Sequence, residues 1–356
     1  MVQKRIHKLR RRMSAHHLKA LLITGRSNVF FLSGFSGSSG YLLITEKDAL
    51  LFTDFRYLQQ AQKQANNFEV VKAEGNSSFS QILSHLSKEG IFELAFEEAY
   101  VTVREYNHLH KAASRLELIP IYNWIEEIRA LKDNEELEYI AKAAAIADSA
   151  WAEVLPLLQP GIAELEVAAE LEYRLRRKGS SQTPFEIIVA SGFRSALPHG
   201  VATSKLIKEN ELVTVDFGAV YRGYSSDITR TFVMGNPNTE QEKIFSLVLE
   251  GQRLAMENIK AGMDCTAADE LVRSFFQENG YEQYFGHGLG HGVGINVHEL
   301  PTLSPKGKGT LQNSMVFTLE PGIYIEGWGG VRLEDLVVLK DEGLQVLTKS
   351  SKALSI

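Results

Sequence analysis

The sequence predicts a small α/β domain followed by a larger α+β domain. Its 356 residues, 44% of them apolar, are enough to form two hydrophobic cores. Short apolar runs alternate with helical patterns in the first third of the chain, which is typical of an α/β sheet. Two long helical patterns and then a succession of strands indicate an α+β domain. We place the domains at residues 1–126 and 127–356, with the boundary near the segment IRALKDNEELEYI.

The first domain begins with a predicted helix over about residues 3–17, in which Ile6, Leu9 and Met13 share one apolar face. Strands are predicted over ALLIT, YLLIT and ALLFTD, separated by the apolar segment NVFFLSGF and by turns at SGSSG and EKD. The segment FRYLQQAQKQA then predicts a helix.

The second domain opens with two predicted helices. Asp133 and Glu136 have the spacing of a capping box, which marks the start of the first helix. That helix ends before Pro160-Gly161. The second runs through ELEVAAELEYRLRRKG, with basic residues in its last turn and Gly179 as its stop.

A β-hairpin is predicted in ELVTVDFGAVYRGYSSDITRTFVMG, with Arg222-Gly223 in the turn. A turn centred on Tyr221-Arg222 would place Asp216 directly opposite Asp227. Opposed Cβ atoms lie roughly 4.5–5.5 Å apart. Two carboxylates at that distance repel each other unless a positive charge lies between them.

A second hairpin is predicted in VFTLEPGIYIEGWGGVRLEDLVVL. A loop centred on Gly327 would place Glu320 opposite Glu334. Pro321 cannot donate a ladder hydrogen bond, so it predicts an edge or a bulge at that point. Two hairpins that each present an acidic pair are hard to explain as surface charges that serve solubility, and they suggest one common site.

An imidazole donor is available in GHGLGHGVGINVHELP. His287 and His291 are four residues apart, but the glycines between and after them argue against a helix, since each costs roughly 1 kcal/mol relative to Ala. We expect a glycine-rich approach to a strand, INVHE.

Singly, each acidic residue or histidine is readily explained as a cap, a turn or a packed side chain. Together, four carboxylates and one imidazole suit a pair of divalent cations and a hydrolytic centre: Asp216, Asp227, His291, Glu320 and Glu334.

These motifs resemble those of the M24-type, or pita-bread (creatinase/aminopeptidase), metallopeptidases, which include methionine aminopeptidase, aminopeptidase P and prolidase. The matching segments are VTVDFG, SSDITRTF, GHGVGINVHE, TLEPGIY, GVRLEDLVVL and IVASGFRSALPHG. The first domain resembles the creatinase-type N-terminal domain through LITGRSNVFFLSGFSGSSG and FTDFRY. The resemblance therefore implies a pita-bread α+β catalytic domain preceded by a smaller creatinase-type α/β domain.

The resemblance also implies a role for each site residue. Asp216 would bind one metal ion in a bidentate manner, Asp227 and Glu334 would bridge two ions, and His291 and Glu320 would complete the set. Glu320 would also act as the proton shuttle while a metal-bridging hydroxide attacks the Xaa-Pro bond. His199 and His298 would contact the scissile peptide, Arg332 would lie near the proline end of the substrate, and His287 would lie on the substrate side or serve only structure.

The implied cofactors are two divalent ions, with Mn²⁺ favoured and Co²⁺, Zn²⁺ or Fe²⁺ as alternatives. In the first domain, the resemblance makes four residues candidates for substrate or interface contacts, although ordinary hairpin and helix-start roles explain them equally well: Phe35, Asp54, Arg56 and Tyr57. It also implies a homodimer that acts on short proline-containing peptides.

Several alternatives share these motifs. A methionine aminopeptidase is disfavoured because its minimal form lacks the first domain. A non-catalytic binding module or a metal-free creatinase-like amidinohydrolase is disfavoured because all five metal-type residues are present. Within the proline-specific branch, the short two-domain layout favours an Xaa-Pro dipeptidase over an aminopeptidase P.

Charge, apolar runs and cysteine content limit the classes of partner and the location expected for the protein. A net charge of −6 argues against nucleic-acid binding. No apolar run reaches the ~18 residues of a membrane span, and the only apolar run near the N-terminus, ALLIT, is shorter than the ~7–15 residues of a signal core. The one cysteine, Cys265, excludes an intrachain disulfide, and we expect a buried packing role for it and a cytoplasmic location for the protein.

Overall fold

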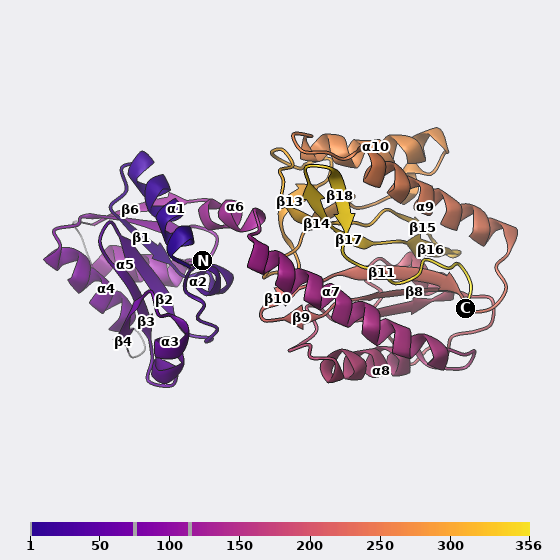
Figure 1. Ribbon diagram of the computed structural model, residues 1–356, viewed down its shortest axis with the longest axis horizontal. Coiled ribbons are helices and arrows are strands. Elements are labelled where there is room, and N and C mark those ends of the chain that lie inside the picture. Colours follow the sequence, from indigo (N-terminus) through magenta and orange to yellow (C-terminus); the bar gives the residue numbers. More distant parts are fainter. Residues whose placement is uncertain (1, 74–76, 113–115) are drawn as a thin grey trace. The chain divides into compact units, whose positions relative to one another are not determined.

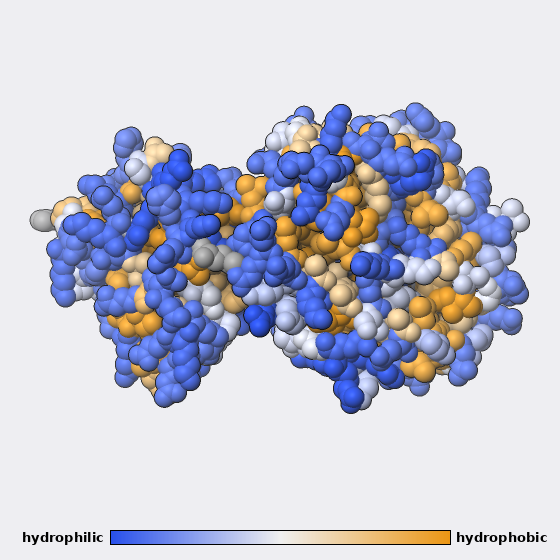
Figure 2. Space-filling view, viewed as in Figure 1, coloured by the Kyte–Doolittle hydropathy of each residue, from blue (hydrophilic) through white to orange (hydrophobic). Residues whose placement is uncertain are grey.

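The computed structural model describes residues 2–73, 77–112 and 116–356. The chain forms two compact units, Met1–Arg129 and Ala130–Ile356 (Figure 1). Both carry mostly hydrophilic residues on the face seen in Figure 2, and hydrophobic residues gather over β17 and β18 of the second unit. Within the described ranges, no helix combines the length and the hydropathy needed to cross a membrane.

The N-terminal unit is a mixed six-stranded sheet in the order β4-β3-β2-β1-β5-β6. Neighbours β1–β2 and β2–β3 are antiparallel, and the other neighbours are parallel. The strands are β1 (Ala20–Ile23), β2 (Tyr41–Thr45), β3 (Ala49–Thr53), β4 (Glu69–Lys72), β5 (Glu93–Glu97) and β6 (Glu117–Ile121). The helices are α1 (Val2–Ala15), α2 (Arg26–Ser33), α3 (Leu58–Gln64), α4 (Ser77–Lys88), α5 (Val103–Ala112) and α6 (Trp124–Ala130).

The three strands and two helices predicted here are confirmed. The apolar segment 28–35 lies mostly in α2, which buries Val29, Phe31 and Leu32. Gly34, at φ +78°, ends this helix in the left-handed conformation that glycine adopts without steric cost.

The C-terminal unit packs two helix pairs against two antiparallel sheets (Figure 1). The first pair is α7 (Asn134–Val154), which begins with the predicted Asp133–Glu136 capping box, and α8 (Glu164–Arg177). Their sheet has the order β11-β8-β7, with β7 at Ile188–Ser191, β8 at Leu212–Phe217 and β11 at Ile228–Val233. Between β8 and β11, the tip of the hairpin forms β9 (Val220–Tyr221) and β10 (Tyr224–Ser225).

The second pair is α9 (Thr239–Asn258) and α10 (Cys265–Glu278), in which Cys265 is buried as expected. These helices cover a sheet in the order β13-β12-β14-β17-β18 and the short hairpin β15–β16. The strands are β12 (Gly290–Gly292), β13 (Glu299–Leu303), β14 (Val316–Leu319), β15 (Gly322–Ile325), β16 (Gly329–Arg332), β17 (Asp335–Lys340) and β18 (Gly343–Val346).

Strand parity sets where the polar residues point. Val215 and Phe217 of β8 join the core under α7 and α8, so Asp216 between them faces the other side of the sheet. Phe317 and Leu319 likewise join the core under α9 and α10, so the following Glu320 faces away from those helices. The carboxylates therefore lie on the faces that the helix pairs leave uncovered.

The register predicted for the first hairpin is wrong by two residues. Asp216 pairs with Thr229, and Tyr221 pairs with Tyr224, so the turn is Arg222-Gly223. These two turn residues have φ +49° and +85°, the left-handed pair that a two-residue hairpin turn of type I′ requires. A shift of two keeps the same face of the strand, so Asp227 is a diagonal neighbour of Asp216 and not its direct partner.

The register predicted for the second hairpin is confirmed on both sides of the acidic pair. Leu319 pairs with Asp335, and Gly322 pairs with Arg332, so Glu320 and Glu334 lie opposite each other. Neither glutamate belongs to a strand, because the ladder is interrupted at Pro321 as expected.

The strand expected at INVHE is wrong. The glycine segment itself forms β12, residues 294–298 form bends, and β13 begins only at Glu299. A Cβ on Gly290 would lie 2.0 Å from the Thr318 carbonyl oxygen, and one on Gly292 would lie 2.1 Å from that of Leu300. Neighbouring backbone approaches β12 too closely for any side chain at these positions, so glycine here permits the strand.

Candidate functional site

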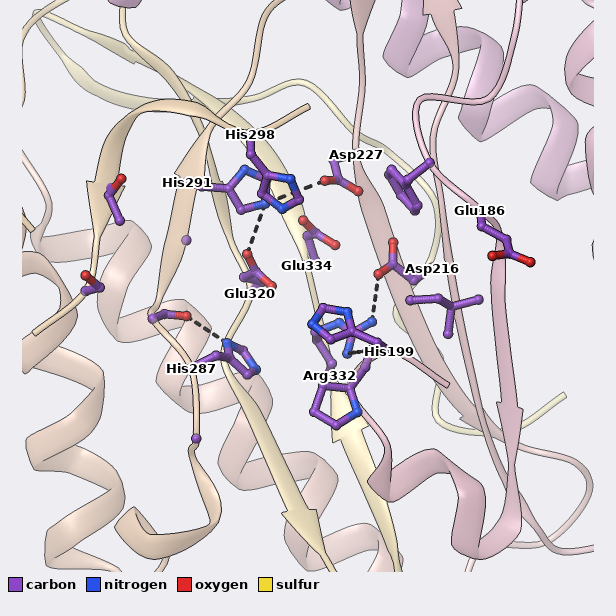
Figure 3. A pocket seen from close by; sticks show the side chains of 18 of the residues that line it. Glu186, His199, Asp216, Asp227, His287, His291, His298, Glu320, Arg332 and Glu334 are labelled. Carbon is purple, nitrogen blue, oxygen red and sulfur yellow. Dashed lines mark hydrogen bonds and ion pairs between the residues drawn. The ribbon is translucent and has the colours of Figure 1, made fainter. Parts of the chain in front are cut away.

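A cleft of about 630 Å³ opens in the C-terminal unit (Figure 3). All nine residues singled out in the catalytic part of the sequence line it: His199, Asp216, Asp227, His287, His291, His298, Glu320, Arg332 and Glu334. Asp216 lies on β8, His291 on β12 and Arg332 on β16, and the other six lie on the segments that connect the strands. The structure thus brings together side chains that are up to 135 positions apart in the chain.

The two aspartates each carry a buried oxygen without a hydrogen-bond partner. These atoms are Oδ1 of Asp216 and Oδ1 of Asp227, and no donor reaches either of them in the described part of the chain. A buried carboxylate oxygen normally has a donor, because leaving it unpaired costs about 1–3 kcal/mol or more. Such orphaned oxygens are explained if the site holds a cation.

His291 lies among the carboxylates. Its Nε2 is 3.3 Å from Oε1 of Glu320 and 3.7 Å from Oδ2 of Asp227. Ligand atoms of Asp227, His291 and Glu334 all lie within 4.8 Å of one another. The Nδ1 atom lies 3.2 Å from the Gly292 carbonyl oxygen, which can only accept, so Nδ1 carries the proton and Nε2 offers its lone pair.

Threonine hydroxyls orient the two glutamates. Thr229 donates to Oε2 of Glu334 at 2.6 Å, and Thr318 donates to Oε1 of Glu320 at 3.1 Å. Glu334 is also fixed through its backbone, since its N–H donates to the Thr229 carbonyl oxygen at 3.1 Å. This last bond joins the two sheets at the cleft.

Without a cation, the cluster favours protonated acids and neutral imidazoles. Burial, and then the charge of Glu334, raises the pKa of Asp227 well above its ordinary value. Burial, and then Glu320, raises the pKa of Glu334 in the same way, and burial raises the pKa of Glu320. Desolvation lowers the pKa of His291. Cations would reverse the cost of ionising the acids, so this donor set fits divalent ions.

Arg332 connects Asp216 to the opposite wall of the cleft. It donates from Nη2 to Oδ2 of Asp216 at 2.7 Å and from Nη1 to the Tyr324 hydroxyl at 2.9 Å. Nε2 of His287 lies 2.8 Å from the same hydroxyl. Desolvation lowers the pKa of His287 and raises that of Tyr324 to about 12, so both groups are neutral near pH 7.

Sequence reasoning missed Tyr324. A signal was available, because Tyr324 has the same strand parity as Glu320 and Gly322, and residues two apart on a strand face the same side. Among the described residues, the group whose ligand atoms lie within 4.8 Å of one another contains Asp227, His291 and Glu334, and it includes neither His287 nor the predicted ligands Asp216 and Glu320.

The two remaining histidines lie at the cleft wall. The rings of His298 and His291 are 4.1 Å apart between centroids. Desolvation, and then His291, lowers the pKa of His298 to about 4, so its imidazole is neutral near pH 7. His199 is exposed on the loop after β7, and Arg332 donates to the carbonyl oxygen of the preceding Pro198 at 3.1 Å.

Glu164, at the start of α8, forms hydrogen bonds that hold the loop carrying His199. This fully buried carboxylate accepts from Ser191 N–H at 2.8 Å, from Thr203 N–H at 3.1 Å and from the Arg194 guanidinium. Sequence reasoning missed it, because a glutamate in a first helical turn is ordinarily explained by the helix dipole.

The four candidates in the N-terminal unit contact one another locally. Arg56 donates to both carboxylate oxygens of Asp54, at 2.9 and 2.8 Å. Phe35 is buried and meets the ring of Tyr57 edge-on, with centroids 5.9 Å apart.

Comparison with known proteins gives matches over nearly the whole chain. The model for metallopeptidase family M24 matches residues 138–341, and that for the creatinase/prolidase N-terminal domain matches residues 5–131. An Xaa-Pro dipeptidase of Pyrococcus horikoshii is 39% identical over 99% of both chains.

Solved structures agree with these matches. The Xaa-Pro dipeptidase from Bacillus anthracis superposes with a TM-score of 0.96 at 40% identity over 100% of both chains. The X-Pro aminopeptidase from Thermotoga maritima superposes with a TM-score of 0.92 at 36% identity over 99% of both chains.

Proposed function

Because the chain belongs to metallopeptidase family M24, we propose that this metallopeptidase hydrolyses the Xaa-Pro bond of short peptides, above all of Xaa-Pro dipeptides. The observation that carries the proposal is the pair of orphaned aspartate oxygens beside a neutral imidazole in an open cleft. Relatives named Xaa-Pro dipeptidase or prolidase, similar over nearly their full length, support the substrate class.

Five residues would hold two divalent ions: Asp216, Asp227, His291, Glu320 and Glu334. Bound ions supply a water of lowered pKa and polarise the substrate carbonyl. A donor set of four carboxylates and one imidazole suits Mn²⁺, and Co²⁺, Zn²⁺ and Fe²⁺ are alternatives. The homodimer and the cytoplasmic location expected from the resemblance remain predictions.

Glu320, a member of this set, and the residues around the set carry out the remaining steps of the reaction. A carboxylate oxygen of Glu320 takes the proton from the attacking water and passes it to the proline nitrogen as the bond breaks. His298 and His199 donate to the carbonyl oxygen as it gains negative charge, and the neutral ring of His298 keeps one N–H for that role. Arg332 holds Asp216 in place and lines the wall where we place the proline end of the substrate. His287 acts on the substrate side through Tyr324.

An aminopeptidase P is the second candidate. The observation that favours it is the close superposition with the X-Pro aminopeptidase from Thermotoga maritima. The two activities share the reaction and differ in whether a residue follows the proline, so the same proposed residues serve both.

Hydrolysis of Ala-Pro beside Ala-Pro-Ala by protein reconstituted with Mn²⁺ distinguishes the two candidates, with a chelator-treated sample as control. We expect faster cleavage of the dipeptide. Faster cleavage of the tripeptide would instead identify an aminopeptidase P. If neither peptide were cleaved in a metal-dependent manner, the proline specificity would be wrong.

A further inference from the structure

The two glutamates lie at a defect in their own hairpin. Leu333 N–H donates to the Pro321 carbonyl oxygen at 3.3 Å. In an unbroken antiparallel pair, residue 321 would return a hydrogen bond to the Leu333 carbonyl oxygen. Proline has no N–H, so that ladder bond cannot form one residue before Glu334.

A glutamine from α9 occupies the defect. Gln252 is 1% exposed, and its Nε2 donates to the Leu333 carbonyl oxygen at 3.1 Å and to the Leu319 carbonyl oxygen at 2.9 Å. These two oxygens belong to the residues directly before Glu334 and Glu320. One amide group therefore spans both strands at the acidic pair.

Lys352 fixes the orientation of that amide. Its ammonium donates to Oε1 of Gln252 at 2.6 Å and forms an ion pair with Asp335, the residue after Glu334. An ammonium can only donate, so it selects the orientation in which the glutamine oxygen faces Lys352 and the nitrogen faces the strands. Arg230 also holds Asp335, since its Nη2 lies 2.7 Å from Oδ1 of Asp335.

We propose that Gln252 is a positioning residue that sets the separation of Glu320 and Glu334. A peptide group is planar, so fixing the Leu319 and Leu333 carbonyl oxygens fixes the planes that lead into the two glutamates. The amide replaces the donor that Pro321 lacks and adds a cross-strand tie. The inference rests on the proposed metal centre, in which both glutamates are ligands.

The test is the Mn²⁺ affinity of chelator-treated Gln252→Met protein, measured by titration calorimetry. Methionine keeps the length of the side chain and removes both donors. Supporting hydrogen bonds around metal ligands contribute about 10–100-fold in affinity, so we expect at least one Mn²⁺ to bind roughly tenfold more weakly.

Gln241→Met is the matched control. Gln241 lies on the same helix, about 16 Å away along its axis, and is also buried. Its amide donates to the Asn210 carbonyl oxygen and accepts from Asn238 N–H, far from the acidic pair. We expect this variant to unfold at a lower temperature while its Mn²⁺ affinity stays at the wild-type value.

The outcomes separate the two proposals. If the wild-type protein bound no Mn²⁺, the metal centre itself would be wrong. If the wild-type protein bound Mn²⁺ and Gln252→Met bound it equally well, only the role of Gln252 would be overturned. Should Gln252→Met not fold, Lys352→Met removes the group that orients the amide from a side chain that is 26% exposed. We expect a smaller loss of Mn²⁺ affinity there, and an unchanged affinity would overturn the inference.

Discussion

The two hairpins of the catalytic unit each deliver a pair of carboxylates, and they do so in different ways. The aspartate hairpin has a two-residue turn, and its acids are diagonal neighbours on one face. The glutamate hairpin has a loop centred on Gly327, and its acids are directly opposite at a break in the ladder. The first pair shares a face through strand parity, and Arg332 holds Asp216, whereas the second pair lies at a break that Gln252 spans from outside the hairpin.

The comparison shows that a site can keep its geometry after a register shift of two residues, and that a broken ladder needs hydrogen bonds from other residues. A register shift of two residues in the aspartate hairpin leaves both acids facing the cleft, because side chains alternate with a period of two. The break at Pro321 removes a ladder bond, and Gln252 ties the backbone before both glutamates from outside the hairpin. Thr229, also outside it, and Thr318, within it, donate to the two carboxylates.

The largest expected effect tests whether both hairpins contribute equally. Asp227→Asn and Glu334→Gln each remove one negative charge from the proposed bridging pair. Each should release Mn²⁺ and lower kcat/KM by about 10³-fold or more, because a catalytic metal contributes several kcal/mol to transition-state stabilisation. Metal content by mass spectrometry of the native protein, with steady-state kinetics, provides the check. Normal activity and metal content in either variant would remove that hairpin from the site.

His298→Ala asks whether a cleft residue outside both hairpins acts without binding metal. Loss of a donor to the carbonyl oxygen should lower kcat by about 10²-fold while Mn²⁺ content is retained. The same two measurements apply. If metal were lost instead, the roles assigned to His291 and His298 would have to be exchanged.

Metal removal should make the aspartate hairpin sensitive to pH. Burial, and then Glu334, raises the pKa of Asp227 above its ordinary 3.8 in the folded state. Its contribution to stability is therefore fully present below about pH 4 and is lost as the pH rises through the raised folded-state pKa.

In EDTA, the unfolding temperature of wild type should thus fall relative to Asp227→Asn by a few degrees between about pH 5 and about pH 8. The cleft histidines have lowered pKa values and act with the opposite sign, losing their contribution as the pH falls below 6.5. They are present in both proteins, so the difference between the two melting curves isolates the carboxyl group. A difference independent of pH would contradict the assignment.

The smallest expected effect concerns the turns. Gly223 and Gly327 have φ +85° and +78°, and Ala at either position should cost about 1 kcal/mol of stability. A Cβ at Gly327 would meet nothing within 4 Å, so strain alone acts there. Urea midpoints measure the loss, and Mn²⁺ affinity should stay unchanged. A large loss of affinity in Gly223→Ala alone would show that the tight turn also fixes the aspartates.

Much of the fold and of the site follows from local patterns. The capping box at Asp133, the glutamate register and the presence of two hairpins were predictable, because each depends on residues close together in sequence. The aspartate register was predicted wrongly although Arg222-Gly223 was correctly placed in the turn, because the pairing was centred on Tyr221-Arg222, one residue before the two that adopt positive φ. The strand at β12 was hidden as well, because its glycines reflect close approach of backbone from distant segments.

The sequence by itself predicted the donor set of four carboxylates and an imidazole, and strand parity turns Asp216 and Glu320 away from the hydrophobic cores. Only the tertiary structure decided how they are held. The contacts of Arg332 with Asp216, of Gln252 with Leu319 and Leu333, and of Glu164 with the His199 loop join segments far apart in the chain. Such contacts have no periodicity or spacing to reveal them, because they depend on how the two sheets and their helices pack.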